Sequence, residues 1–195
     1  MSFSFWEYKT WLSDIDFAVI GSGIVGLNCA LALRKQHPKS KIVIFERGML
    51  PSGASTKNAG FACFGSMSEI LDDLKTHSEA EVVQLVKNRV EGLQLLRETL
   101  GDAKLDYQEN GGFELFTKTD STLFESCQAN IKYVNNLLEP IFKEEVFAVQ
   151  DNTFGFQNIQ PKLIFSKFEG QIDTGKMMLS LLKKVADENI LILNV

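Results

Sequence analysis

One short segment, Gly21-Ser22-Gly23-Ile24-Val25-Gly26, constrains the fold of this chain more than any other. It directly follows the apolar run Asp16–Ile20, which is typical of a buried parallel strand. It also opens a stretch with helical spacing that extends from about Gly23 to Lys35, and a second apolar run, Lys41–Phe45, comes next. The beginning of the chain therefore predicts a strand–helix–strand unit joined by a glycine-rich turn.

The three glycines fit the known requirements of a dinucleotide-binding turn. Gly21 permits the tight turn, Gly23 lets a pyrophosphate approach the main chain, and Gly26 lets helix and strand pack closely. The amides and partial positive charge at the helix N-terminus favour phosphate there. A glycine-rich turn without a ligand is the alternative interpretation.

An acidic residue stands where such a site needs one. Glu46 lies 20 positions beyond Gly26, at the end of the second predicted strand. A carboxylate there accepts hydrogen bonds from the adenosine ribose, and its charge disfavours the 2′-phosphate of NADP. Together with the turn, Glu46 predicts a site for an adenosine diphosphate group.

The segment from Ser52 to Gly60 favours FAD over NAD. An NAD-binding domain normally enters another helix here, but this segment is too rich in small residues and glycine. Gly53 and Gly60 permit close main-chain approach, and Lys57 adds a positive charge for phosphate or for the flavin edge. Its hydrogen-bonding side chains are Ser55, Thr56 and Asn58. An ordinary surface loop is the alternative.

The rest of the chain predicts an α/β fold in which a Rossmann-like βαβ unit carries an inserted α+β domain. Capping-box patterns at Ser66/Glu69 and Ser78/Glu81 predict two helices, the second reaching Leu100. The further elements expected are a strand at 113–116, a helix at 121–138 that ends before Pro140, strands at 145–150 and 163–168, a helix at about 175–188 and a strand at 190–193. The last helix and strand are expected to return to the first sheet.

Several segments resemble the amino-acid and amine oxidase family of FAD enzymes, which includes D-amino acid oxidase, glycine and sarcosine oxidases and γ-glutamylputrescine oxidase. The similar segments are GSGIVG, FERG, PSGASTKNAGF and GQIDTGKMMLSLL. The resemblance is strongest over residues 16–62 and 169–195. It implies three parts: a first FAD-binding segment at 1–65, a partial substrate or cap domain at 66–170, and a return helix and strand at 171–195.

The resemblance also implies a function. It implies oxidation of a C–N bond of a small amine or amino acid, with hydride transfer to flavin N5. No acid or base need come from this part of the fold, and the catalytic residues are left unknown. The resemblance adds Arg47 to the residues that line the cofactor. Lys57 departs from the family pattern, in which arginine is common at this position. The residues expected to bind FAD are Gly21, Gly23, Ile24, Val25, Gly26, Glu46, Arg47, Ser55, Thr56, Lys57, Asn58, Ala59 and Gly60.

Family members are considerably longer than 195 residues, so the fold is expected to be incomplete at its C-terminus and the isolated chain to be inactive or only partly active. Two alternatives stay open: a non-catalytic FAD-binding or interaction fragment, and an NAD-dependent dehydrogenase. The substrate, the electron acceptor, the oligomeric state and any covalent flavin link are left undetermined by the sequence.

Composition excludes other classes of protein. A net charge of −5 argues against nucleic-acid binding, and two histidines with three scattered cysteines offer no zinc spacing. The start of the chain lacks the features of a signal peptide, and no apolar run is long enough to span a membrane, so a cytoplasmic location with reduced thiols is expected.

Three weaker signals receive a structural interpretation. Residues 170–176 fit GxxxxGK, but Met177 stands where a P-loop needs Ser or Thr, so a helix start capped by Asp173 or Thr174 is expected. Cys63 is expected to be a buried core thiol. Four phenylalanines are also expected to be core residues, although they could wall a substrate cavity: Phe113, Phe116, Phe154 and Phe156.

Overall fold

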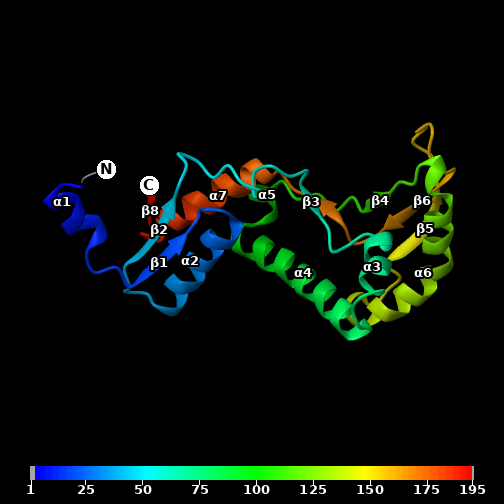
Figure 1. The fold of residues 1–195 in the computed structure, drawn as a ribbon, viewed down its shortest axis with the longest axis horizontal. Coiled ribbons are helices and arrows are strands. Elements are labelled where there is room, and N and C mark those ends of the chain that lie inside the picture. The colour runs from blue at the N-terminus through cyan, green and yellow to red at the C-terminus, as the bar shows by residue number, and fades with distance from the viewer. Residues whose placement is uncertain (1–2, 195) are drawn as a thin grey trace. The chain divides into compact units, whose positions relative to one another are not determined.

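The computed structural model describes residues 3–194, and the chain divides into two compact units (Figure 1). Unit 1 consists of Met1–Gly60, Ala103–Leu105 and Asp173–Val195. Unit 2 consists of Phe61–Asp102 and Asp106–Ile172. The first and last parts of the sequence therefore belong to the same unit.

Unit 1 contains a parallel sheet with the strand order β1-β2-β8: β1 (Phe17–Ile20), β2 (Ile42–Glu46) and β8 (Leu191–Asn194). The central strand β2 is buried along almost its whole length, which explains its uninterrupted apolar run. Because β8 pairs with β2 in parallel, the expected return of the chain to the first sheet is confirmed.

Two helices of unit 1, α2 (Ile24–Gln36) and α7 (Thr174–Asp187), pack against each other, and α2 also contacts β1 and β2 (Figure 1). The buried residues of these helices include Leu27 and Ala30 of α2 and Leu181 and Val185 of α7. A short N-terminal helix, α1 (Phe5–Glu7), continues as the π-helical segment η1 (Tyr8–Leu12). The sequence analysis did not predict this helix.

Unit 2 packs helices against a three-stranded antiparallel sheet with the order β4-β6-β5. The strands are β4 (Gly112–Glu114), β5 (Phe147–Asp151) and β6 (Lys162–Ser166). The helices are α3 (Met67–Asp73), α4 (Glu79–Leu100), α5 (Asp102–Leu105, which straddles both units), the 3₁₀ turn η2 (Lys118–Asp120) and α6 (Ser121–Phe142). A separate ladder pairs β3 (Phe61–Ala62) with β7 (Gly170–Gln171).

Both predicted capping boxes form. The Ser66 and Ser78 hydroxyls each accept a hydrogen bond from the amide three residues on, and the Glu69 and Glu81 carboxylates accept one from the capping serine's amide. As predicted, α4 ends at Leu100, where Gly101 takes a positive φ of 85°.

The predicted end of α6 before Pro140 is wrong, because the helix continues to Phe142. Proline in this last turn removes one hydrogen-bond donor but leaves the preceding turns intact. Ile141 and Phe142 pack against the core of unit 2, and this burial favours the extra turn. Lys143 then ends the helix in the left-handed conformation, with φ 62°.

Among the described residues 3–194, none of the helices combines the length and the apolarity that a membrane span requires.

Candidate functional site

The glycine-rich turn of unit 1 has the geometry that its sequence predicts. Gly21 has φ 90°, which favours glycine, and its amide donates to the Phe45 carbonyl of β2 at 2.7 Å. A Cβ on Gly26 would lie 2.0 Å from the Gly21 carbonyl oxygen. The close packing of α2 on the turn therefore requires glycine at position 26.

Glu46 is 8% exposed, and its carboxylate binds the turn. The Ser22 amide and hydroxyl both donate to Glu46 Oε2, at 2.8 and 2.7 Å, and the Gly48 amide donates to Oε1 at 3.0 Å. These hydrogen bonds, those from Ser22 first, lower the pKa of Glu46 below its usual range. Glu46 is therefore an anionic acceptor at neutral pH.

Ser55 lies at the N-terminus of α2, although it is 31 residues distant in sequence. Its Oγ accepts a hydrogen bond from the Ile24 amide at 2.9 Å. The N-cap residue of α2 is Gly23, which has no side chain to cap the helix, so Ser55 satisfies one of the amides that a helix leaves unpaired at its start.

These residues surround a cavity of about 350 Å³, which we call the turn cavity. Five of the predicted cofactor residues line it: Gly21, Gly23, Glu46, Arg47 and Ser55. The other lining residues are Ile20, Phe45 and residues 51–54. The structure thus brings the glycine turn, the end of β2 and the beginning of the small-residue segment together around one hollow.

The later part of the small-residue segment does not line the turn cavity. Thr56 Oγ1 donates to the Pro51 and Gly53 carbonyls at 3.2 and 3.1 Å. Asn58 Nδ2 donates to the Ala54 carbonyl at 2.9 Å, and Asn58 Oδ1 accepts from the Gly60 amide at 3.0 Å. Both side chains therefore hold the loop in shape.

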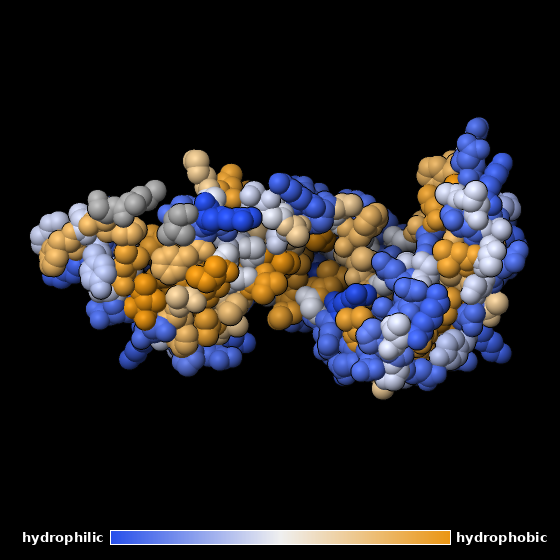
Figure 2. All heavy atoms as spheres, viewed as in Figure 1, coloured by the Kyte–Doolittle hydropathy of each residue, from blue (hydrophilic) through white to orange (hydrophobic). Residues whose placement is uncertain are grey.

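The remaining predicted residues differ in exposure. Lys57 and Ala59 are exposed, Gly60 is buried, and the first turn of α2 contains Ile24, Val25 and Gly26. Val25 is 80% exposed and Ile20, at the rim of the turn cavity, 81%. Figure 2 shows apolar surface over the part of unit 1 that contains the sheet, and the exposed Met49 and Leu50 follow β2.

The apparent P-loop at residues 170–176 is a helix start, as expected. Asp173 is the N-cap of α7, and its Oδ1 accepts from the Lys176 amide at 2.9 Å. Met177, at the position where a P-loop holds magnesium, is buried in unit 1.

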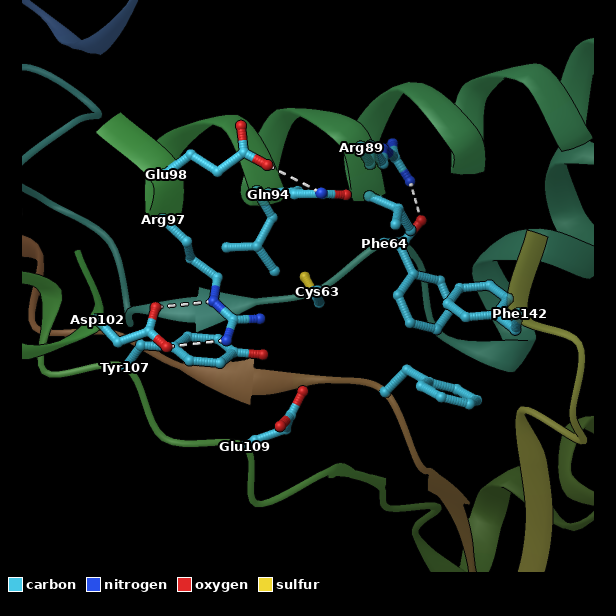
Figure 3. A pocket seen from close by; sticks show the side chains of 13 residues that line it. Cys63, Phe64, Arg89, Gln94, Arg97, Glu98, Asp102, Tyr107, Glu109 and Phe142 are labelled. Carbon is cyan, nitrogen blue, oxygen red and sulfur yellow. Dashed lines mark hydrogen bonds and ion pairs between the residues drawn. The ribbon is translucent and has the colours of Figure 1, made fainter. Parts of the chain in front are cut away.

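A cavity of about 640 Å³ lies in unit 2, beside α4 (Figure 3). Arg97 binds Asp102 through two hydrogen bonds of 2.8 and 2.9 Å, and its guanidinium lies 4.0 Å from the centre of the Tyr107 ring. Arg89 donates to the Phe64 carbonyl at 2.9 Å. The two arginines that line this cavity thus already have partners within the chain, and we assign the cavity no ligand.

Two expectations about core residues are corrected by the structure. Cys63 is exposed, because it follows strand β3 with alternating burial, in which Ala62 and Phe64 point inward. Among the four phenylalanines, Phe116 is buried, but the other three are exposed: Phe113 (39%), Phe154 (53%) and Phe156 (52%). The Phe113 ring packs edge-on against Phe154 at 4.9 Å, so these rings cluster at the surface of unit 2.

The sequence analysis missed the role of Ser22, which occupies a variable position of the glycine motif. Its signal was present in the sequence, since a hydroxyl in this turn can reach the acid at the end of the next strand. It also missed three carboxylates of unit 2 that share one cavity, Glu69, Glu114 and Glu169. No motif connects them, because they are far apart in sequence.

The parallel sheet, the glycine turn and the acid at the end of β2 define a dinucleotide-binding protein of the α/β class. Residues 16–194 match the family described as DAO, FAD dependent oxidoreductase. The chain belongs to this family, and the predicted FAD-dependent oxidoreductase class and FAD cofactor are thereby confirmed.

Solved structures show the same fold at low sequence identity. L-amino acid deaminase from Proteus myxofaciens, in complex with anthranilate, matches with a TM-score of 0.65 and 18% identity over 93% of this chain and 38% of its own. Glycine oxidase from Geobacillus kaustophilus matches with a TM-score of 0.58 and 20% identity, over 92% of this chain and 46% of its own. Iminodiacetate oxidase from Chelativorans sp. BNC1 matches with a TM-score of 0.61 and 16% identity, over 91% of this chain and 46% of its own. No curated protein matches the chain. The chain therefore spans less than half the length of these three structures.

Proposed function

We propose that unit 1 binds the adenosine diphosphate part of FAD in the turn cavity, and that the chain serves the oxidation of a C–N bond in an amino acid or amine. The arrangement of the turn, Glu46 and Ser55 around one cavity carries the first part of the proposal. Family membership over residues 16–194 supports the second part.

The groups around the turn cavity fit this cofactor. The amides in the first turn of α2 and the positive end of the helix dipole suit the pyrophosphate. Ser55 Oγ already accepts from Ile24, and its own hydrogen can be donated to a phosphate oxygen. Arg47, at the rim, adds a positive charge near the phosphates.

Glu46 can also accept a hydrogen bond from one hydroxyl of the adenosine ribose. A carboxylate offers about four lone-pair positions, and the hydrogen bonds from Ser22 and Gly48 occupy three of them. The lowered pKa keeps Glu46 charged at neutral pH, and this charge disfavours the 2′-phosphate of NADP.

Bound FAD would supply the acceptor for a hydride from the carbon next to nitrogen. The residues of this chain would grip and orient the cofactor, and we assign none of them a role in the chemical step. The names of the similar structures support amino-acid or amine substrates, since they are an L-amino acid deaminase, a glycine oxidase and an iminodiacetate oxidase.

We further propose that the chain corresponds to the N-terminal part of this fold. Residues 1–65 and 171–195 would form the FAD-binding part, and residues 66–170 part of the substrate domain. Low coverage of the similar structures supports this proposal. A small-molecule substrate stays a prediction from the family resemblance, and the absence of a nucleic-acid partner and a cytoplasmic location stay predictions from the sequence composition.

Titration of FAD into the chain, followed by thermal unfolding, tests the cofactor site. We expect FAD to raise Tm, because ligand at 100 times Kd stabilises the folded state by about 2.7 kcal/mol. ADP should compete with FAD, and NADP should have no effect. An unchanged Tm with FAD, or an equal rise with NADP, would contradict the site.

The proposed reaction needs a separate test. The FAD-loaded protein is mixed without oxygen with single amino acids and amines, and the visible absorbance of the flavin is followed. Bleaching by one of these compounds supports C–N oxidation. Bleaching by hydroxy acids alone would overturn the proposed reaction and leave the cofactor site intact.

A further inference from the structure

Unit 2 contains a cavity of about 330 Å³ that the proposed cofactor site does not use. We call it the acid cavity, because Glu69 of α3, Glu114 of β4 and Glu169 line it. The rest of its wall is mostly apolar, from side chains that include Met67, Phe113, Phe147 and Ile164. This volume lies within the range of small-molecule sites, which is about 300–1,000 Å³.

Two residues that line the acid cavity each carry a buried side-chain oxygen without a partner among the described residues. The two atoms are Ser166 Oγ and Glu169 Oε1. Ser166 as a whole is only 4% exposed. A buried polar atom left without a hydrogen bond costs about 1–3 kcal/mol, so two such atoms on residues that line one cavity indicate that a donor belongs there.

The fold makes room for the Glu169 carboxylate. A Cβ on Gly112 would lie 2.1 Å from Glu169 Oε2, so any side chain at position 112 would displace this carboxylate. Glu169 directly precedes strand β7, and the absence of a side chain on β4 lets it lie against that strand. The position of Glu169 is therefore specified by two segments distant in sequence.

The acid cavity concentrates negative charge. Glu114 accepts hydrogen bonds from the Ser68 amide, at 3.3 Å, and from the Ser68 hydroxyl, and Glu69 accepts from the Ser66 amide at 2.9 Å. Burial, together with the charges of Glu114 and Glu69, raises the pKa of Glu169 to about 7. A positive ligand would relieve this repulsion.

The geometry distinguishes between two kinds of positive ligand. Among the described residues, no group of three His, Cys, Asp or Glu side chains is spaced to hold a metal ion. The wall is mostly apolar, and two of the residues in it, Ser166 and Glu169, carry acceptors without a partner among the described residues. This combination suits an organic ammonium group, which donates up to three hydrogen bonds and carries an apolar body.

We propose that the acid cavity binds an organic ammonium ion, with Glu169 Oε1 and Ser166 Oγ as acceptors and the apolar wall around its carbon skeleton. The proposal stands without the cofactor site, because every residue in it belongs to unit 2. If the proposed C–N oxidation holds, the acid cavity is a candidate for the group that selects an amine.

Benzylammonium chloride tests the proposal, with benzyl alcohol as the neutral analogue and benzoate as the anion of similar size. Each compound is titrated into the chain without FAD, and Tm and calorimetric binding are measured. We expect saturable binding of benzylammonium only. Glu169→Gln should weaken it about tenfold or more, which corresponds to about 1.4 kcal/mol. Glu125→Gln, on an exposed part of α6, should leave it unchanged.

A second variant protects the test against loss of folding. Gly112→Ala keeps all three carboxylates but displaces the one at position 169, so it should also weaken benzylammonium binding. Equal binding of benzyl alcohol, unchanged binding in both variants, or stabilisation by Mg²⁺ in place of the amine would each overturn the proposal. Failure to bind FAD would leave these results unaffected.

Discussion

Ser22 and Glu46 connect the glycine-rich turn to the end of β2 through two hydrogen bonds, 2.8 Å from the amide and 2.7 Å from the hydroxyl. Both donors reach the same carboxylate oxygen. The acid at the end of β2 therefore shapes the turn in addition to presenting an acceptor to the cavity. A change at Glu46 should affect both the folded state and the grip on the cofactor.

Glu46→Gln should lower the free energy of unfolding at pH 7 by about 1–3 kcal/mol, because an amide nitrogen cannot accept the hydrogen bonds that a second carboxylate oxygen accepts. The pKa of Glu46 is lowered in the folded state from its ordinary 4.5. Its stabilisation is thus full above pH 4.5 and is lost as pH falls through the lower, folded-state pKa. Urea unfolding at pH 7 and below pH 4 measures the difference.

The exposed Glu188→Gln provides the matched control and should change stability little at either pH. We expect the difference between wild type and Glu46→Gln to shrink in acid, and FAD binding to weaken in this variant alone. A difference that is constant with pH would mean that the charge of Glu46 contributes nothing.

Much of the fold could be predicted because its signals are local. The buried run of β2, the glycine spacing and the capping boxes at Ser66 and Ser78 each lie within a few residues and depend on local geometry. Pro140 was misleading because the end of α6 depends on core contacts of the residues that follow it. Propensity gives way to tertiary packing in that last turn.

The candidate site divides in the same way. Gly21, Gly26 and Glu46 follow from spacing alone, whereas the capping of α2 by Ser55 connects positions 24 and 55 across a folded loop. The acid cavity brings Glu114 and Glu169 together from two different segments. No periodicity or motif encodes that meeting, so it became visible only in three dimensions.

Two glycine-to-alanine changes on helices should have opposite effects. Gly26→Ala places a Cβ 2.0 Å from the Gly21 carbonyl oxygen, and such overpacking costs about 1–3 kcal/mol or more. Gly92→Ala in α4 meets no atom within 4 Å and should stabilise the helix by about 0.5–1 kcal/mol. Thermal unfolding of both proteins checks the signs, and stable folding of Gly26→Ala would contradict the close packing of the turn.

Ser55→Ala should destabilise unit 1 by about 0.5–2 kcal/mol, the range for loss of a helix N-cap, since the Ile24 amide loses its acceptor. The same change should weaken FAD binding. Ser126→Ala on α6 of unit 2 is the control, because its side chain is exposed, lies outside the turn cavity and has no hydrogen bond among the described residues. Chemical denaturation and FAD titration of both variants compare the two serines; equal effects would mean that Ser55 does not cap α2.

Glu169→Gln should change the pH dependence of stability in the opposite sense from Glu46→Gln. The folded-state pKa of Glu169 is raised from 4.5 to about 7, by burial first and then by the charges of Glu114 and Glu69. Folded protein therefore holds a proton that unfolded protein has lost, and the free energy of unfolding falls as pH rises from 4.5 to about 7. A neutral glutamine removes this loss, so Glu169→Gln should be more stable than wild type at pH 8 and similar to it at pH 5.

Urea unfolding at both pH values, with Glu125→Gln as the exposed control, measures this pH-dependent difference in stability. If Glu169→Gln is less stable than wild type at pH 8, the carboxylate has an unseen partner in the free chain, and the acid cavity has no need of an ammonium ligand.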